Sequence, residues 1–173
     1  MLVSEQIFND TISLISSDLN KDIDNIILNK LKKKYEGLCK DNSFILNNSI
    51  NILKRSLGRI ETSDNINYIK YDISYKCNTL SPTIGDKIDC HVNNINKMGI
   101  IAYIRIEDQY KTSDNNFDNS PLIIIIPNDI INEGSLNLND INLEQKLQIE
   151  ILGTRIKYRN EKIQVVGKIL EKN

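Results

Sequence analysis

Three cysteines and one histidine are the side chains in this sequence best suited to metal or nucleophilic chemistry. They are Cys39, Cys77, Cys90 and His91. The adjacent pair Cys90 and His91 would point to opposite faces of a strand, and no C-x-x-C spacing presents two thiolates together. This spacing disfavours a zinc site. The odd number and wide spacing of the cysteines indicate ordinary buried or half-buried thiols in a reducing compartment rather than a disulfide framework.

The other polar residues form no pattern that is typical of an active site. His91 has no nucleophile near it in the sequence, and there is no glycine-rich phosphate loop. The carboxylates are scattered among asparagine-rich segments without a repeated pairing. We therefore expect a non-catalytic protein with no catalytic residues, no cofactor and no metal ion.

Alternating cations near the C-terminus are the main candidates for binding nucleic acid. Arg155, Lys157 and Arg159 alternate with Ile156 and Tyr158, which in a strand would place the cations on one face and the apolar pair inward. Such a stripe is typical of a phosphate track, and a solvated strand face held by nearby acids explains it equally well. With 22 basic and 23 acidic residues the net charge is -1, so any RNA site must be local.

The segment Gly85 to Ile104, GDKIDCHVNNINKMGIIAYI, predicts a β-hairpin that would carry further RNA contacts. One predicted face is apolar and comprises Ile88, Cys90, Val92, Ile100, Ala102, Ile104 and Ile106. On the outward face Tyr103 could offer a ring to a base, with Arg105 beside it. Together with Lys97 in the turn, the predicted RNA-binding residues are Lys97, Tyr103, Arg105, Arg155, Lys157 and Arg159.

The strands expected in the second half of the chain must position these residues, and together they indicate a small closed barrel. After the hairpin come a polar loop (107–120), an isoleucine-rich strand (122–126) that Pro127 stops, and a final pair (146–158 and 162–170). Five strands with one long polar loop favour a five-stranded OB-type β-barrel, a common nucleic-acid-binding fold. In the all-isoleucine run Ile123 to Ile126 we expect barrel interior rather than a ligand surface.

The first half predicts a β-α-β-β-β order, which makes the whole chain α+β. Strands are expected over 7–15, 44–53, 59–61 and 66–75, and an amphipathic helix over 19–35. Ser16, Ser17 or Asp18 could cap this helix, and Gly37 could close it. The lysines at 32–34 suit the negative helix end, which explains them better than RNA binding does. Pro82 marks a seam within 77–83, so we predict two domains, 1–82 and 83–173.

The order of these parts resembles one family, the stalk subunit that is seventh by size in eukaryotic RNA polymerase II and its archaeal counterpart, the E-prime subunit. The residues that carry the resemblance are DTISLISSDLNKDI (10–23), KLKKKYEGLC (30–39), SFILNNSINI (43–52), LGRI (57–60), YIKYDISYKC (68–77) and the hairpin quoted above. The similarity extends to about Ile130. Beyond that point only the strand pattern agrees.

The resemblance implies a role for each half of the chain. The first half would be a truncated two-layer tip domain that docks on the large polymerase core subunits, and the second half an OB-type barrel near nascent single-stranded RNA. The implied docking residues are Lys54, Arg55, Gly58 and Arg59; the alternative is a solvated hairpin turn in which Gly58 supplies backbone freedom. A small helical stalk partner would bind along the groove between the domains, so an apolar strip is expected at the seam.

The sequence departs from the family where RNA-binding barrels of this type place an aromatic after the turn glycine, because Ile100 and Ile101 stand there instead. Three functions compete: a polymerase stalk subunit, a free-standing OB-fold RNA-binding factor of translation or RNA decay, and a structural interaction module. The β-α-β-β-β half favours the stalk subunit, since a free-standing RNA binder does not need it.

No leader and no long apolar run is present, so an intracellular protein without membrane contact is expected. The bias toward Asn, Ile and Lys indicates a large DNA virus of eukaryotes as a source, with an AT-rich protist as the alternative. The location would then be the nucleus, or the cytoplasmic viral factory and virion.

Overall fold

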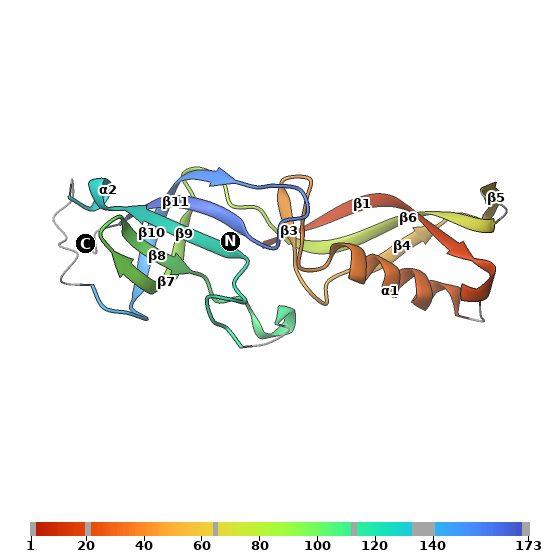
Figure 1. The fold of residues 1–173 in the computed structure, drawn as a ribbon, viewed down its shortest axis with the longest axis horizontal. Coiled ribbons are helices and arrows are strands. Elements are labelled where there is room, and N and C mark those ends of the chain that lie inside the picture. The colour runs from red at the N-terminus through yellow and green to blue at the C-terminus, as the bar shows by residue number, and fades with distance from the viewer. Residues whose placement is uncertain (1–2, 20–21, 64–65, 112–113, 133–140, 171–173) are drawn as a thin grey trace.

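One long strand, β6 (Ile66–Leu80), organises the N-terminal half of the protein in this computed structural model (Figure 1). The structure describes residues 3–19, 22–63, 66–111, 114–132 and 141–170. Along one edge of β6 lies β1 (Val3–Ile15), and along the other edge lie, end to end, β3 (Ser43–Ile45), β4 (Asn51–Arg55) and β5 (Arg59–Ser63). The two-residue strand β2 (Cys39–Lys40) pairs with β3. The pairings in this sheet are antiparallel.

A single helix, α1 (Ile23–Tyr35), covers one face of this sheet and buries Ile27, Leu31 and Tyr35 there. Its N-cap is Asp22, whose side chain accepts a hydrogen bond from the Asn25 amide, and not the predicted Ser16, Ser17 or Asp18. Those three residues form a 3-10 turn (Ser16–Asp18), and residues 20 and 21 lie outside the described part of the chain. The last helical turn carries the three lysines, and Gly37 has the expected left-handed φ of +75°.

The predicted strand over 44–53 is divided into β3 and β4. Between them Asn48 adopts a left-handed φ of 56°, while Leu46 and Ile50 turn into the interior. The hairpin turn considered as the alternative interpretation of residues 54–59 is not formed. Both β4 and β5 run antiparallel to β6, so the chain passes along β6 without reversing at Leu57 and Gly58.

The C-terminal half is a closed barrel of five strands, which confirms that part of the predicted fold. The strands are β7 (Lys87–Asn96), β8 (Gly99–Tyr103), β9 (Leu122–Pro127), β10 (Lys146–Arg155) and β11 (Ile163–Ile169). They pair in the order β10-β11-β9-β8-β7, and β7 closes against β10. Only the β9–β11 pairing within the barrel is parallel. A 3-10 turn (Asp108–Tyr110) follows β8, and a short helix, α2 (Asn128–Asn132), follows β9.

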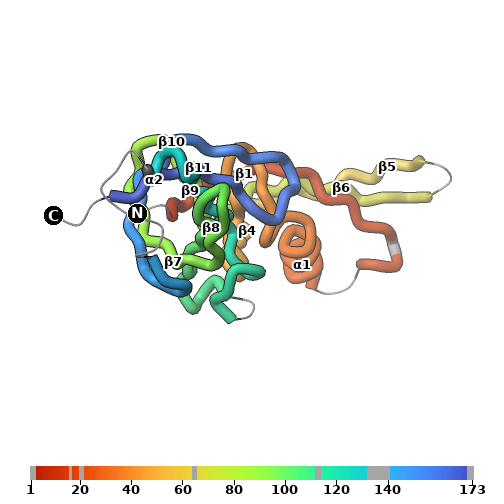
Figure 2. The backbone as a smooth tube through the Cα atoms, turned by 60° about the vertical axis from the view of Figure 1, so that its left-hand side comes forward, coloured from red at the N-terminus to blue at the C-terminus, as the bar shows by residue number. Residues whose placement is uncertain are grey.

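Two apolar clusters hold the molecule together, one under α1 and one inside the barrel. The barrel cluster contains the predicted inward residues Ile88, Cys90, Val92, Ile100, Ala102 and Ile104, and it extends to Cys39, Phe44, Leu46 and Leu80 of the N-terminal sheet. The halves are also joined by backbone, because the Cys39 amide donates to the Asn160 carbonyl and the Arg159 amide donates to the Cys39 carbonyl, each at 2.8 Å. The result is an elongated molecule with β5 at the end opposite the barrel (Figures 1 and 2). Among the described residues, no helix is long and apolar enough to cross a membrane.

Candidate interaction surfaces

The six predicted RNA-binding residues do not form one surface. Lys97 lies in the turn between β7 and β8, near Pro127 at the end of β9, because Gly99 pairs with Pro127. Arg155 and the residues that follow it lie at the opposite end, because β11 begins beside Leu122 at the start of β9. Arg105 follows β8 and pairs with Glu144 at 3.3 Å. The set is therefore divided among three places on the barrel.

Tyr103 does not offer an open ring, which corrects the expectation that it could stack on a base. Only 2% of its surface is exposed. Its ring lies 5.8 Å from the ring of His91 and 6.4 Å from that of Phe117, and its hydroxyl donates to the Glu144 carboxylate at 2.8 Å. Neighbouring side chains thus cover Tyr103, which the alternation predicted to point outward into solvent.

The cation stripe is not a strand face. Strand β10 ends at Arg155, so Lys157 and Arg159 belong to the loop that leads to β11. Tyr158 is 63% exposed rather than inward, and Arg159 has a φ of 61°. The alternation failed here because the chain turns at Tyr158 and Arg159 in order to pair with Cys39 of the N-terminal sheet.

The loop between β10 and β11 nevertheless carries cations that pair with no carboxylate of the described residues. They are Arg155, Lys157, Arg159 and Lys162. Arg159 lies over the ring of Tyr158, and Lys162 donates to the Phe117 carbonyl at 2.8 Å. Elsewhere cations are commonly neutralised, as in the pairs of Lys34 with Asp10 and Lys76 with Glu5. This loop is therefore a local positive site on a protein that has no net positive charge.

At the far end of the N-terminal sheet, two of the predicted docking residues are engaged within the fold. Arg55 pairs with Asp24 of α1 at 2.6 Å and lies over the Tyr71 ring. Arg59 pairs with Asp72 at 2.9 Å. Because both guanidinium groups already have partners, they are less available to another protein than the sequence suggested.

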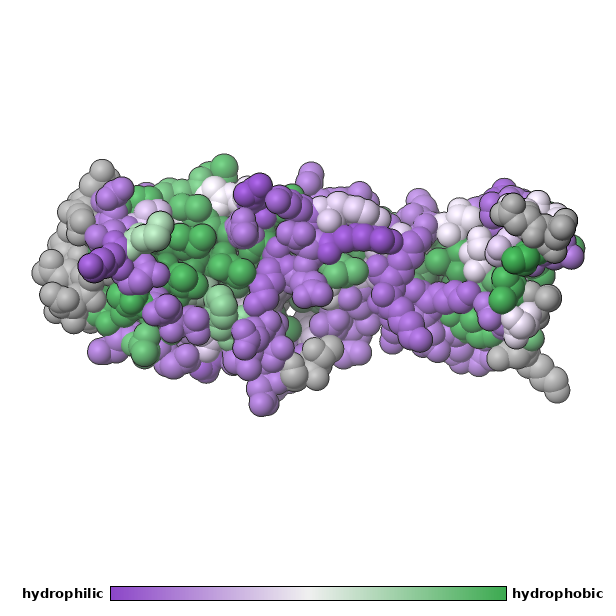
Figure 3. All heavy atoms as spheres, in the orientation of Figure 1, coloured by the Kyte–Doolittle hydropathy of each residue, from purple (hydrophilic) through white to green (hydrophobic). Residues whose placement is uncertain are grey.

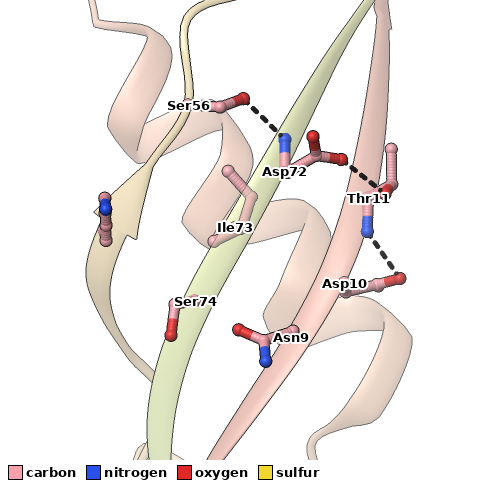
Figure 4. A pocket seen from close by; sticks show the side chains of 8 residues that line it. Asn9, Asp10, Thr11, Ser56, Asp72, Ile73 and Ser74 are labelled. Carbon is pink, nitrogen blue, oxygen red and sulfur yellow. Dashed lines mark hydrogen bonds between the residues drawn. The ribbon is translucent and has the colours of Figure 1, made fainter.

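Lys54 has no such partner among the described residues and lines a shallow hollow on the sheet face away from α1 (Figure 4). At the centre of this hollow, the Asp72 carboxylate accepts from the Thr11 hydroxyl at 2.8 Å, and the Asp72 amide donates to the Ser56 hydroxyl at 2.9 Å. These hydrogen bonds tie β1, β6 and the segment after β4 together across the hollow.

Gly58 is required for close packing rather than for backbone freedom. Its φ is not positive, and a Cβ atom there would lie 2.6 Å from Ile69 Cγ2 and 3.0 Å from Tyr71 Cε1. The absence of a side chain lets the chain between β4 and β5 pass close to Ile69 and Tyr71 of β6. The structure thus gives a steric reason for this glycine.

Exposed apolar residues at the same end were missed in the sequence. Leu57 is 90% exposed and Ile60 is 76% exposed, and every residue of β5 is exposed. Figure 3 shows apolar atoms gathered at this end of the molecule. The only sequence signal for their exposure is that Leu57 and Ile60 stand among polar residues. The strand pairing must be known before this signal can be interpreted.

The seam between the halves contains an apolar pocket of about 350 Å³. Its apolar lining is Val3, Leu46, Leu80, Ile88, Ile104 and Ile106. Its charged lining residues are of both signs: Asp86, Asp89 and Glu107, with Lys87 and Arg105. This is the place where the resemblance leads us to expect an apolar strip.

The three cysteines are free and buried. Burial raises the pKa of Cys39 to about 11 and those of Cys77 and Cys90 to about 12, so these thiols stay protonated at neutral pH. No three metal-ligating side chains gather within the described ranges. His91 faces Tyr103 and not a cysteine cluster.

No protein-family model matches the chain, and no curated protein matches its sequence.

Proposed function

We propose that the protein is a non-catalytic stalk subunit of a multisubunit DNA-dependent RNA polymerase. It docks on the large core subunits by the far end of its N-terminal sheet. The apolar end formed by Leu57 and Ile60 carries this proposal. Contiguous exposed apolar patches mark protein contacts, and Leu57 and Ile60 lie close together in the chain where the family resemblance places the docking tip.

Two further features support this proposal. The seam pocket offers a helical stalk partner an apolar floor with charged residues of both signs around it. If the barrel strands are numbered from one to five in chain order, the third is parallel to the fifth and the fourth pairs with the first, and this closed barrel supports the proposed OB-type domain. The barrel would contact nascent RNA weakly through the cations of the β10–β11 loop.

A free-standing OB-fold RNA-binding factor is the second candidate, and the unpaired cations of that loop favour it. Such a factor has no use for an apolar end on the side of the molecule opposite the barrel (Figure 1). The two candidates therefore differ in whether Leu57 and Ile60 have a partner.

Purification of the tagged protein from its native source, followed by mass spectrometry, tests the proposal. The wild-type protein should retain the large polymerase subunits and a small helical partner. Leu57→Asp with Ile60→Asp should lose the large subunits and keep the small partner, because the seam is untouched. Charge reversal at Arg55 and Arg59 is a poorer test, because both side chains form ion pairs within the fold.

Met98→Asp is the matched control, because Met98 is 84% exposed in a barrel turn. This variant should retain every subunit. Recovery of the large subunits with the Leu57 and Ile60 double variant would reject docking by this end of the sheet. If the wild-type protein recovers no polymerase subunit, the stalk assignment itself fails.

A further inference from the structure

The outside of the barrel has one polar part and one aliphatic part. On β7 and the first half of β10 the outward residues are Lys87, Asp89, His91, Lys146, Gln148 and Glu150. On β8, β9 and β11 the outward residues include Ile101, Ile123, Ile125 and Val166. Figure 3 shows apolar surface over this part of the barrel. We call Ile101, Ile123, Ile125 and Val166 the aliphatic face; Leu152 of β10 is a further exposed aliphatic residue outside this set.

These side chains are aligned across the strands. Ile101 pairs with Ile125, and Ile125 pairs with Val166, so the three form one row on neighbouring strands. Ile125 is 40% exposed and Val166 is 37% exposed. Strands lie about 4.8 Å apart, so the row is roughly 10 Å long.

The sequence of β9 is that of a strand covered on both sides. All six residues, LIIIIP, are apolar. A strand with one face in water normally alternates with polar residues, whereas a continuous apolar run is typical of a strand that is buried on both faces. Leu122, Ile124 and Ile126 fill the barrel, whereas Ile125 stays 40% exposed. Within the described residues, this apolar strand therefore keeps a partly open outer face.

The charges beside the aliphatic face are positive. A second row lies beside the row of Ile101, Ile125 and Val166. In this second row Ile123 pairs with Gln164, and Gln164 pairs with Arg155. Arg159 and Lys162 line a hollow together with Ile123 and Gln164. The loop from Arg155 to Lys162 contains four cations against the single carboxylate of Glu161, so its formal charge is +3.

We propose that the aliphatic face binds an acidic amphipathic helix of a protein partner. The barrel is closed, so β8, β9 and β11 have no free edge to which a partner strand could add, and recognition must come from side chains. Aliphatic residues at i, i+4 and i+7 of a helix span about 10 Å, which matches the row from Ile101 to Val166. Acidic residues on the same helix would reach the cations of the β10–β11 loop.

Single-stranded RNA fits this face less well than a helix does. Bases stack on aromatic or guanidinium planes, and this face presents branched aliphatic chains while Tyr103 is buried. RNA would bind the cations of the β10–β11 loop and would make no contact with the row of Ile101, Ile125 and Val166. This inference does not depend on the polymerase role, because it concerns a different surface from the sheet end and the seam.

A phage-displayed library of 18-residue amphipathic helices provides the test, with aliphatic positions varied and every polar position fixed as Glu. A matched library carries Lys at the polar positions. The full-length protein should select binders from the Glu library only. The double variant Ile125→Asp with Val166→Asp should lower the affinity for the selected peptides by at least tenfold. The triple variant Arg155→Ala, Lys157→Ala and Arg159→Ala should lower this affinity by several-fold.

Gln148→Asp, on the polar part of the barrel, is the matched control and should bind as the wild type does. Circular dichroism should show that each variant is folded, and Ile125→Ser with Val166→Ser replaces the Asp pair if that pair unfolds. The proposal is overturned if neither library yields binders, if only the Lys library does, or if the Ile125 and Val166 variants bind normally.

Two other occupants give distinct results. Oligouridine that shifts the methyl NMR signals of Ile125 and Val166 as strongly as it shifts the loop would assign the face to RNA and overturn the proposal. A dimer in light scattering that the Ile125 and Val166 variants abolish would assign it to a second copy of the chain, with the same consequence.

Discussion

At the scale of the residue, neighbouring isoleucines of β9 have different surroundings. Ile124 is fully buried among Val92, Ile100 and Val165, whereas Ile125 is 40% exposed on the aliphatic face. The side chains are chemically identical and adjacent, so burial alone distinguishes them. Their effects on folding and on binding should therefore separate.

We predict that Ile124→Ala lowers the free energy of unfolding by about 2–5 kcal/mol, as large-to-small changes in a packed core do. Ile125→Ala should lower it by less than about 1 kcal/mol. Urea unfolding monitored by circular dichroism measures both. Equal losses in the two variants would mean that the outward assignment of Ile125, and with it the aliphatic face, is wrong.

Asp10 is the residue whose charge the fold depends on most clearly. Burial acts to raise its pKa, but hydrogen bonds from Lys34 and Tyr35, each at 2.7 Å, more than offset this, and the pKa lies below its ordinary value. A carboxylate with a lowered folded-state pKa stabilises the fold above its unfolded pKa and loses that contribution as the pH falls through its folded pKa.

We therefore predict that Asp10→Asn lowers the free energy of unfolding by roughly 1 kcal/mol between pH 5 and 7, since the ion pair is part-buried. Below about pH 4 the difference from the wild type should shrink, because the wild-type carboxyl also becomes neutral there. Unfolding curves across this pH range measure it. A difference that stays constant down to pH 2 would show that the charge of Asp10 is not what stabilises the pair.

At the scale of the element, the small strand β2 links the two halves. Cys39 exchanges backbone hydrogen bonds with the β10–β11 loop. The next residue, Lys40, places its ammonium over the rings of Phe8, Tyr35 and Tyr75 at 4.3–5.3 Å and donates to the Tyr75 hydroxyl at 3.0 Å. Cation–π contacts of this kind hold β2 on the N-terminal sheet, and β2 in turn fixes where the loop cations lie.

Those cations predict a shallow dependence of RNA affinity on salt. Each neutralised phosphate contributes roughly 0.7 to the slope of log affinity against log salt for single strands. Arg155→Ala with Lys157→Ala and Arg159→Ala should reduce that slope by up to roughly 2. Filter binding of oligouridine over a salt series measures it. The control Lys32→Ala with Lys33→Ala and Lys87→Ala removes equal charge and should leave the slope in place; a slope that falls equally in both variants would exclude a local site.

The alternation in the sequence was sufficient to predict the barrel strands and most of their inward residues. It failed where a local feature depends on a distant partner. Tyr103 lies outward by alternation but is covered by Phe117 and bound to Glu144, and Tyr158 leaves the strand because the loop pairs with Cys39. The path of β4 and β5 along β6 could not be predicted, because strand pairing is a long-range interaction that local sequence patterns do not determine. The aliphatic face was missed because the run Ile123 to Ile126 reads as interior throughout.

At the scale of the whole molecule, the protein is elongated and has separate surfaces along its length. Strand β5 lies at one end and the barrel at the other (Figure 1). Leu57 and Ile60 belong to the β5 end, the aliphatic face belongs to the barrel, and the seam pocket is lined by residues of both halves. This arrangement suits a subunit that joins a large assembly at one end and projects from it. The stalk proposal requires above all that the sheet end contacts the polymerase core.

Site-specific photo-crosslinking tests that requirement most directly. A benzophenone amino acid would replace Leu57 in one protein and Met98 in another, and each would be irradiated in extracts of the native source. We predict that the probe at Leu57 crosslinks to a large RNA polymerase subunit, identified by mass spectrometry, and that the probe at Met98 does not. A Leu57 probe that reaches no polymerase subunit, in a protein shown to be folded, would contradict the proposed function.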